Sequence, residues 1–202
     1  MNSSPIPQLL LASQSPRRAE LLRQINVAFE QCPAHTDETV QPGESAEAYV
    51  ERVARAKAEA VWARQGAASG RSVLGADTAV VMGEDILGKP RDRQDFMDTL
   101  GRLSGRSHQV WSAVALVDAQ GSRSRVSVST VHFRRIDAAE LAAYWASGEP
   151  ADKAGGYAIQ GFAAVFVRRL EGSYSGVMGL PLHETDNLLR ACGITPAPVA
   201  PG

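Results

Sequence analysis

The sequence predicts an α/β protein built on a mixed, twisted sheet with flanking helices. Short apolar runs of strand length alternate with segments in which apolar residues recur at helical spacing. In the second half, turn-forming residues such as those at 118–121 link neighbouring strands, which indicates hairpins in the same sheet. The length of 202 residues fits one domain, expected at 8–193, and the proline-rich segment 194–202 is predicted to be a flexible tail.

Strands and helices alternate in the first half of the predicted fold. Ser15 is suited to cap the first helix and Pro16 to open it. Apolar residues spaced three and four apart, including Val53 and Val61, predict the second helix. A polar loop, 33–45, precedes it. The expected elements are a strand at 9–12, a helix at 16–25, a strand at 27–32, a helix at 46–65 and a strand at 72–82 that turns back into 86–87.

The second half is expected to add more strands to this sheet and more helices around it. Gly105 is expected to end the first of these helices. The expected elements are a helix at 92–103, strands at 110–117 and 125–133, a helix at 138–146, strands at 157–160 and 163–167, and a helix at 181–191. Because no linker separates these elements from the first half, all of them are assigned to one fold.

Composition and charge exclude several classes of protein. The 21 basic and 22 acidic side chains give a net charge of −1, which argues against a nucleic-acid partner. The sequence has neither an apolar run of about 18 residues for a membrane span nor a signal-peptide pattern. Cys32 and Cys192 lie far apart without metal-ligand spacing, so both are expected to be unpaired thiols. These features predict a soluble, cytoplasmic protein.

Three familiar motifs are present only in part. The segment 83–90 matches a phosphate-binding P-loop until Pro90, which lacks the hydroxyl that the motif needs for Mg²⁺. Tyr174 occupies the place of the serine in a nucleophile elbow, and Asn187 the place of the second histidine in a zinc-protease helix. None of the three indicates a function.

Positively charged residues at three points of the sequence indicate a phosphate site. Arg17 and Arg18 follow Ser13 and fall in the first turn of a predicted helix, where the helix end itself favours anions. Their guanidinium groups can bind phosphate in a bidentate manner, or they can be solvated or salt-bridged. Lys57 lies on the apolar stripe of its helix, from which it either reaches the surface or points into a cleft. Lys89, which follows an apolar strand, is a similar candidate.

Carboxylates at two points indicate a metal or a water at the same place. Asp77 lies inside the apolar run 73–81, where a buried carboxylate needs a metal, a cation or a hydrogen-bond partner. Asp37 and Glu38 lie in the polar loop, where simple solvation would also account for them. Mg²⁺ usually binds through one or two carboxylates together with substrate phosphates, and a carboxylate can also deprotonate a water. The residues alone therefore indicate a phosphorylated small molecule as ligand.

The sequence resembles the Maf family of nucleotide pyrophosphatases in a series of motifs. Residues 11–22, LASQSPRRAELL, are similar to the opening motif of that family. The likeness continues in order through GADT at 75–78, GKP at 88–90 and KAGGYAIQG at 153–161, and it ends near residue 191.

This resemblance implies an elongated fold with two lobes around a central cleft, related in shape to inosine-triphosphate pyrophosphatases. It implies hydrolysis of a nucleoside triphosphate to the monophosphate and pyrophosphate, with Mg²⁺ or Mn²⁺ as cofactor, in a chain that forms a homodimer. Asp77 matches the proton acceptor of the family and Glu38 an acidic residue that assists the metal or the water, so both are expected to bind the metal. The residues that match the phosphate cleft are Ser13, Arg17, Arg18, Lys57 and Lys89.

Three positions distinguish the subgroups of the family, and here they are Arg17, Thr78 and Gln160. They resemble the dTTP/UTP pyrophosphatases, and the Gln160 amide could pair with N3–H and a carbonyl of uracil or thymine. CTP or a modified pyrimidine nucleotide stays open as the physiological substrate. Two further functions also stay open, namely a 7-methyl-GTP or inosine-type pyrophosphatase and a nucleotide-sensing regulator of septum formation.

Overall fold

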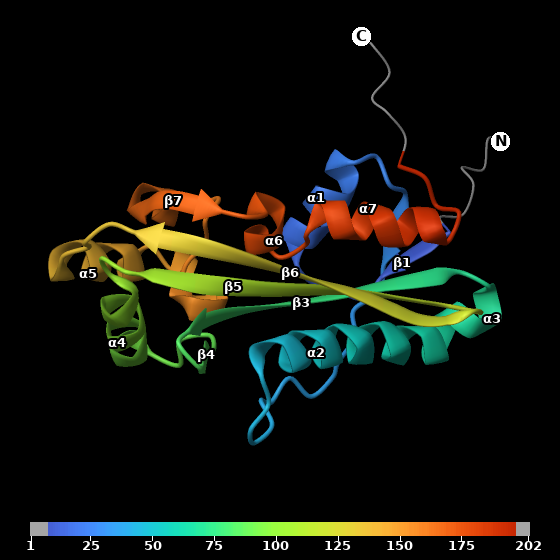
Figure 1. Ribbon diagram of the computed structural model, residues 1–202, viewed down its shortest axis with the longest axis horizontal. Coiled ribbons are helices and arrows are strands. Elements are labelled where there is room, and N and C mark those ends of the chain that lie inside the picture. The colour runs from blue at the N-terminus through green and yellow to red at the C-terminus, as the bar shows by residue number, and fades with distance from the viewer. Residues whose placement is uncertain (1–7, 197–202) are drawn as a thin grey trace, which may run out of the picture.

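The fold is a twisted mixed sheet that runs along the long axis of the molecule, as the computed structural model of residues 8–196 shows (Figure 1). The strand order is β2-β1-β3-β5-β6-β7, with β4 paired to β3. β1 pairs in parallel with β2 and β3, and the other pairs are antiparallel, so the predicted mixed sheet is confirmed. The strands are β1 (Leu9–Leu11), β2 (Phe29–Gln31), β3 (Ser72–Met82), β4 (Asp85–Leu87), β5 (Ser107–Asp118), β6 (Gly121–Phe133) and β7 (Val167–Glu171).

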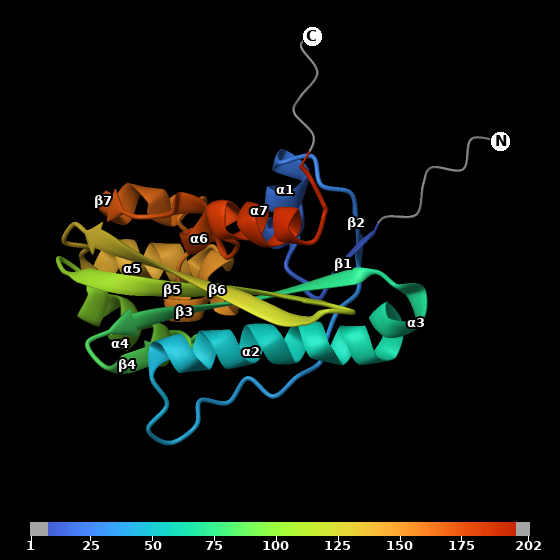
Figure 2. The same ribbon diagram turned by 45° about the vertical axis from the view of Figure 1, so that its right-hand side comes forward.

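Helices cover both faces of the sheet. On one face lie α1 (Pro16–Gln24) and α7 (Leu182–Ala191), and on the other lies α2 (Ala46–Val61), as both ribbon views show (Figures 1 and 2). The helices α4 (Arg93–Leu103) and α5 (Ala138–Ala146) lie at the far end of the sheet, on the left in Figure 1. No helix within residues 8–196 is long and apolar enough to cross a membrane.

The core follows from the alternation of side chains along the strands. In β1, Leu9 and Leu11 belong to the cluster under α1 and α7, whereas Leu10 belongs to the cluster under α2. All three leucines are fully buried, because successive side chains of a strand point to opposite faces and both faces are covered here. A third cluster, rich in aromatic residues such as Phe96 and Tyr144, fills the end near α4 and α5.

A close contact between α2 and β3 sets the geometry of the molecule's centre. Gly75 of β3 lies so near the helix that a Cβ atom on it would be 2.3 Å from the Ala54 carbonyl oxygen. Only glycine permits this approach of helix to strand. Because of it, Lys57 of α2 lies against Asp77 of β3.

The segment that follows α5 differs from the prediction. The strands expected at 157–160 and 163–167 are absent. Two 3₁₀ turns, Glu149–Asp152 and Ala154–Gly156, precede the first of these segments, and a third, Phe162–Phe166, occupies most of the second. The first predicted strand is interrupted by a turn, which a hydrogen bond from the Gly161 N–H to the Ala158 carbonyl oxygen closes at 3.0 Å. Burial repeats with a period of three in 162–166, which suits a 3₁₀ turn and not a strand.

The remaining differences concern short elements and the end of the chain. β7 begins at Val167, where the predicted strand ended, and the short helix α6 (Tyr174–Met178) was not predicted. The predicted helix at 46–65 is α2 followed by a π-helical turn at Trp62–Gly66 and by α3 (Ala67–Ser69). Most of the predicted tail, 197–202, lies outside the described residues.

Candidate active site

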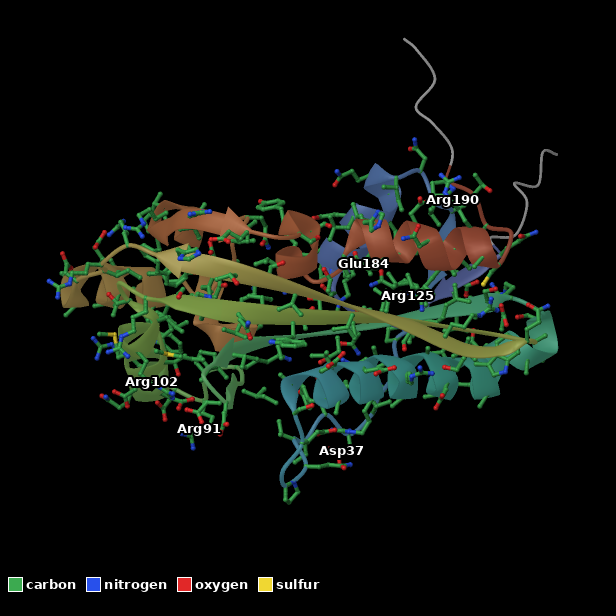
Figure 3. The ribbon with its side chains drawn as sticks, viewed as in Figure 1. Asp37, Arg91, Arg102, Arg125, Glu184 and Arg190 are labelled. Carbon is green, nitrogen blue, oxygen red and sulfur yellow. The ribbon has the colours of Figure 1, made fainter. Side chains whose placement is uncertain are left out.

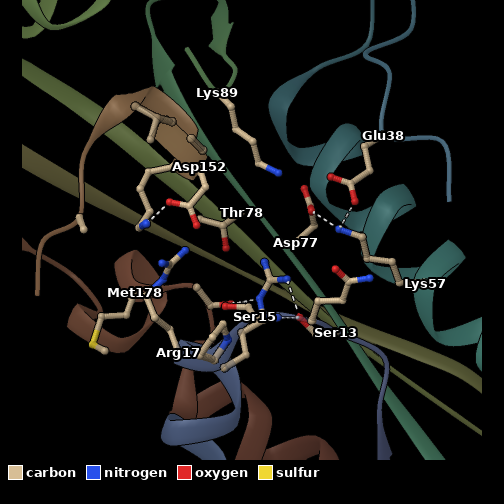
Figure 4. A pocket seen from close by; sticks show the side chains of 18 of the residues that line it. Ser13, Ser15, Arg17, Glu38, Lys57, Asp77, Thr78, Lys89, Asp152 and Met178 are labelled. Carbon is tan, nitrogen blue, oxygen red and sulfur yellow. Dashed lines mark hydrogen bonds and ion pairs between the residues drawn. The ribbon is translucent and has the colours of Figure 1, made fainter. Parts of the chain in front are cut away.

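A cavity of about 720 Å³ lies where α1, α2, β3 and the segment 152–160 meet (Figure 4). This volume is typical of small-molecule sites. The segments that line it are far apart in the sequence and are brought together by the sheet. The residues to which the family resemblance gives a role all line this one cavity, and they are Ser13, Arg17, Arg18, Glu38, Lys57, Asp77, Thr78, Lys89 and Gln160. Asp37, the other carboxylate of the polar loop, does not line it.

A buried lysine joins two carboxylates at the centre of the cavity. The Lys57 Nζ donates to Asp77 Oδ1 at 2.8 Å and lies 2.8 Å from Glu38 Oε1. The side chains of Lys57 and Asp77 are 8% and 6% exposed, and that of Glu38 is 46% exposed. Lys57 therefore points into a cleft and does not reach the surface. The other oxygen of Asp77, Oδ2, is buried without a hydrogen-bond partner in the described chain.

The surroundings move the pKa values of the two carboxyl groups in opposite directions. Burial raises the pKa of Asp77, against the opposing charges of Lys57 and Arg18. Partial burial also acts to raise the pKa of Glu38, but the hydrogen bond and charge of Lys57, with the charges of Lys89 and Arg18, lower it overall. Asp77 is therefore the better proton acceptor of the two, and Glu38 stays ionised more readily.

The two arginines enter the cavity from the start of α1. Arg18 donates from Nε to the Gly179 carbonyl oxygen at 2.8 Å and from a terminal nitrogen to Ser13 Oγ at 3.2 Å. Burial lowers the pKa of Arg18, although an arginine remains charged at any physiological pH. Within residues 8–196, neither Arg17 nor Arg18 forms an ion pair with a carboxylate, so these arginines are not salt-bridged. Both guanidinium groups thus remain available to an anion.

Lys89 approaches the carboxylates from the opposite side of the cavity. It follows β4 in the chain, and its side chain extends toward Asp77 and Glu38 (Figure 4). Its charge contributes to the lowered pKa of Glu38. Cations therefore surround the two carboxylates on several sides.

Thr78 donates a hydrogen bond within the cavity wall. Its Oγ1 lies 2.9 Å from Ser112 Oγ, which donates to the Gly176 carbonyl oxygen at 2.7 Å. Because Ser112 has one hydroxyl hydrogen and uses it on Gly176, the Thr78 hydroxyl is the donor to Ser112. The Thr78 oxygen keeps its lone pairs as acceptors.

Several lining residues were not identified from the sequence. Lys153, within the motif that also carries Gln160, forms an ion pair with Asp152 and donates to the Glu149 carbonyl oxygen at 3.3 Å. The hydrogen bond from Lys153, with the charge of Arg17 as a weaker cause, lowers the pKa of Asp152. Thr36 also lines the cavity, and its Oγ1 is buried without a partner in the described chain. Lys153 could have been identified from the sequence, because it is a cation inside the quoted motif 153–161. Thr36 lies in no quoted motif, so nothing in the sequence pointed to it.

Asp77 and Glu38, which meet at Lys57, can offer carboxylate oxygens to a metal, whereas Asp152 on the cavity wall is paired with Lys153. No group of three or more His, Cys, Asp or Glu side chains suited to a metal occurs between residues 8 and 196. Mg²⁺ needs only one or two carboxylates when substrate phosphates complete its coordination. The unpartnered Asp77 Oδ2 fits that mode of binding. Cys32 and Cys192 are both free thiols, as predicted.

The cations that line this cavity suit an anionic ligand. The two carboxylates among them are groups that can accept a proton from a water, so the site is of the kind found in hydrolytic α/β proteins. Residues 8–192 match the family model described as "Maf-like protein". The chain therefore belongs to the Maf family.

Relatives named dTTP/UTP pyrophosphatase match nearly the whole chain. That of Hahella chejuensis is 51% identical over 187 residues, which cover 93% of each chain. That of an Anaeromyxobacter species is 53% identical over 191 residues, which cover 92% of this chain and 90% of the relative. Among solved structures, the Staphylococcus aureus Ham1 protein gives a TM-score of 0.46 at 15% identity and covers 91% of this chain and 96% of that chain.

Proposed function

We propose that this protein hydrolyses dTTP and UTP to the nucleoside monophosphates and pyrophosphate. The observation that carries the proposal is the buried Asp77, with one oxygen on Lys57 and the other unpartnered, in a cavity lined by cations. The relatives of that name, at 51% and 53% identity, support the choice of reaction and of substrate.

The cations bind the triphosphate. Arg17 and Arg18 lie at the N-terminus of α1, where backbone N–H groups add to the positive field, and their guanidinium groups suit phosphate oxygens. Lys57 and Lys89 reach the same space from α2 and from the loop after β4. Ser13, already bonded to Arg18, holds that arginine in place.

Asp77 accepts the proton of the attacking water. The water oxygen forms a bond to the α-phosphorus, its proton passes to Asp77, and the bond from the α-phosphorus to the bridging oxygen breaks. Pyrophosphate leaves with its negative charge balanced by the arginines and lysines. A divalent cation, Mg²⁺ or Mn²⁺, held by Asp77 and Glu38 together with substrate phosphates, supplies further charge neutralisation when bound.

The base lies at the end of the cavity formed by the segment 157–160. The Gln160 carboxamide offers one donor and one acceptor, which match a carbonyl and N3–H of uracil or thymine. Arg17 and Thr78 complete the set of specificity residues. In this proposal the protein is a cytoplasmic homodimer that removes surplus or non-standard nucleotides before they are incorporated.

A panel of triphosphates tests the reaction and the competing functions. Pyrophosphate release is measured with UTP, dTTP, CTP, 7-methyl-GTP and ITP, each with and without Mg²⁺. The expected result is the highest kcat/KM with UTP and dTTP, and only in the presence of the metal. Faster turnover of 7-methyl-GTP or ITP contradicts the substrate assignment. Nucleotide binding with no pyrophosphate release from any of them favours a nucleotide-sensing regulator.

A further inference from the structure

The backbone that carries Gln160 is irregular, and the two residues that bracket it are held by side chains. Gln160 lies in a turn closed by a hydrogen bond from the Gly161 N–H to the Ala158 carbonyl oxygen at 3.0 Å. The turn belongs to no helix or strand, and the burial of Ile159 in the core holds its first half. Hydrogen bonds from two side chains hold the backbone on either side of Gln160.

Tyr144, on α5, holds the side of the turn before Gln160. Its hydroxyl accepts a hydrogen bond from the Ala158 backbone N–H at 3.3 Å and donates to Glu149 Oε1 at 2.8 Å. The ring is buried at the end of the sheet, with 1% of the residue exposed. Burial and then the hydrogen bond to Glu149 raise the pKa of Tyr144, so its hydroxyl stays protonated and remains a donor.

Glu149 holds the side of the turn after Gln160. Its Oε2 accepts a hydrogen bond from the Phe162 backbone N–H at 3.0 Å, while its Oε1 receives the Tyr144 hydroxyl. Gly161 passes directly over this carboxylate, because a Cβ atom at that position would lie 2.3 Å from Oε1. The backbone at 158 and at 162 is thus tied to one pair of side chains, two residues on either side of Gln160.

We propose that Tyr144 and Glu149 are positioning residues that fix the Gln160 carboxamide against the base and so set the pyrimidine specificity of the enzyme. This inference rests on the function proposed above, in which Gln160 binds the base. Neither side chain lines the cavity, so their effect on the substrate passes through the turn. The cations that bind the phosphates lie on other elements and do not depend on this pair.

The test is a double-mutant cycle between the Tyr144 hydroxyl and Gln160. Tyr144→Phe removes the hydroxyl and keeps the ring in the core. In the otherwise unchanged protein it is expected to raise the KM for UTP on the order of tenfold and to leave kcat nearly unchanged. In a Gln160→Ala background it is expected to add no further rise, because there the turn no longer carries a group that binds the base.

Two further measurements separate positioning from a general structural effect. Inhibition by pyrophosphate, which contacts only the phosphate end, is expected to be the same in Tyr144→Phe as in the unchanged protein. Glu149→Gln, which turns one of the two acceptors into a donor facing an N–H or a hydroxyl, is expected to reproduce the rise in KM. Tyr174→Phe is the matched control, because Tyr174 is 49% exposed and lies outside the cavity lining.

The outcomes distinguish this inference from the proposed function. If the unchanged protein does not hydrolyse UTP or dTTP, the function itself fails. If it does and Gln160→Ala raises the KM, but Tyr144→Phe and Glu149→Gln do not, only the positioning role is overturned. An equal effect of Tyr144→Phe with and without Gln160, or a parallel loss of pyrophosphate inhibition, also overturns it. A KM for UTP that Gln160→Ala leaves unchanged removes the role of Gln160 on which the inference rests.

Discussion

The two ends of the cavity are built in different ways. The phosphate end takes Arg18 from α1, Lys57 from α2 and Asp77 from β3, and adds Glu38 and Lys89 from loops. The base end takes Gln160 from a turn between 3₁₀ segments, held in place by side chains. The centre of the phosphate end is therefore fixed by the sheet and its helices, whereas the base end is an irregular segment fixed by buried side chains such as Ile159 and by hydrogen bonds from Tyr144 and Glu149.

This difference separates the chemical step from the choice of substrate. Changes at Asp77, Lys57 and Arg18 should affect every nucleotide alike, because all of them share the triphosphate. Changes at the base end should affect the preference among nucleotides and leave the chemical step intact. Variants at each end test this separation, beginning with the one expected to lower the rate most.

Asp77→Asn should lower pyrophosphate release from UTP and dTTP about 10²–10⁴-fold, because it removes the proton acceptor. The folded protein should be no less stable at neutral pH. Burial raises the pKa of Asp77, so the ionised form opposes folding above that pKa, and the amide removes this cost. Initial rates and thermal unfolding at pH 7 measure both effects.

Asp37→Asn is the control for that variant. Asp37 lies in the same polar loop as Glu38 but outside the cavity lining, and Figure 3 places it on the loop that leads into α2. Its rate should match that of the unchanged protein. A near-normal rate in Asp77→Asn would exclude Asp77 from the central role.

Arg18→Met should lower kcat/KM about a hundredfold for all the nucleotides that the protein hydrolyses, because it removes charge-assisted hydrogen bonds to phosphate. The ratio between UTP and CTP should not change. Arg23→Met, in the last turn of the same helix, is the matched control and should have normal activity. A change in the ratio between nucleotides would mean that the two ends of the cavity are coupled.

Gln160→Ala should lower the preference for UTP and dTTP over other nucleotides about tenfold, because it removes the hydrogen bonds to the base. Inhibition by pyrophosphate should stay the same. Steady-state kinetics with each nucleotide measure the preference. An equal loss of kcat with all nucleotides would place Gln160 in the chemical step and break the separation.

The smallest expected effect concerns stability beneath the base end. His108 Nε2 lies 2.8 Å from the hydroxyl of the buried Tyr157, and burial, with the nearby His132, lowers the pKa of His108 from 6.5 to about 4. A pKa that is lowered by folding contributes stability above pH 6.5, and this is lost as the pH falls toward 4. The loss should be on the order of 3 kcal/mol at most.

Thermal unfolding between pH 7 and pH 4 measures this contribution. The unchanged protein should lose stability across that range more steeply than His108→Gln, which cannot take up a proton there. Equal slopes would show that His108 does not contribute. Above pH 6.5 the rates of both proteins with UTP should be similar, because His108 lies outside the cavity lining.

Asp77 and Lys57 of the phosphate end could be predicted from the sequence because they have unusual positions in regular elements, whereas the role of Glu38, in a loop, came from the resemblance. An aspartate inside an apolar strand and a lysine on the apolar stripe of a helix each need a partner. The structure brings Lys57 and Asp77 together at 2.8 Å. The strands and helices around them were also predictable, because their periodic patterns extend over many residues.

The base end was predicted less well. Gln160 was identified from a resemblance, but the segments 157–160 and 163–167 were predicted as strands. The chain turns between Ala158 and Gly161 and then forms the 3₁₀ turn Phe162–Phe166. The bonds from Tyr144 and Glu149 to the backbone of this segment depend on the fold as a whole, and no local pattern reports them.

The most direct test of the central claim is the pH dependence of kcat/KM for UTP in the unchanged protein and in Lys57→Met. The claim is that Asp77 is the proton acceptor, with a pKa that burial raises and the bonded Lys57 lowers. The acid limb should lie above the ordinary aspartate pKa of about 3.9, and it should move to higher pH in Lys57→Met, because the cation that lowers the pKa of Asp77 is gone. An acid limb that stays in place or moves to lower pH in Lys57→Met would contradict the account.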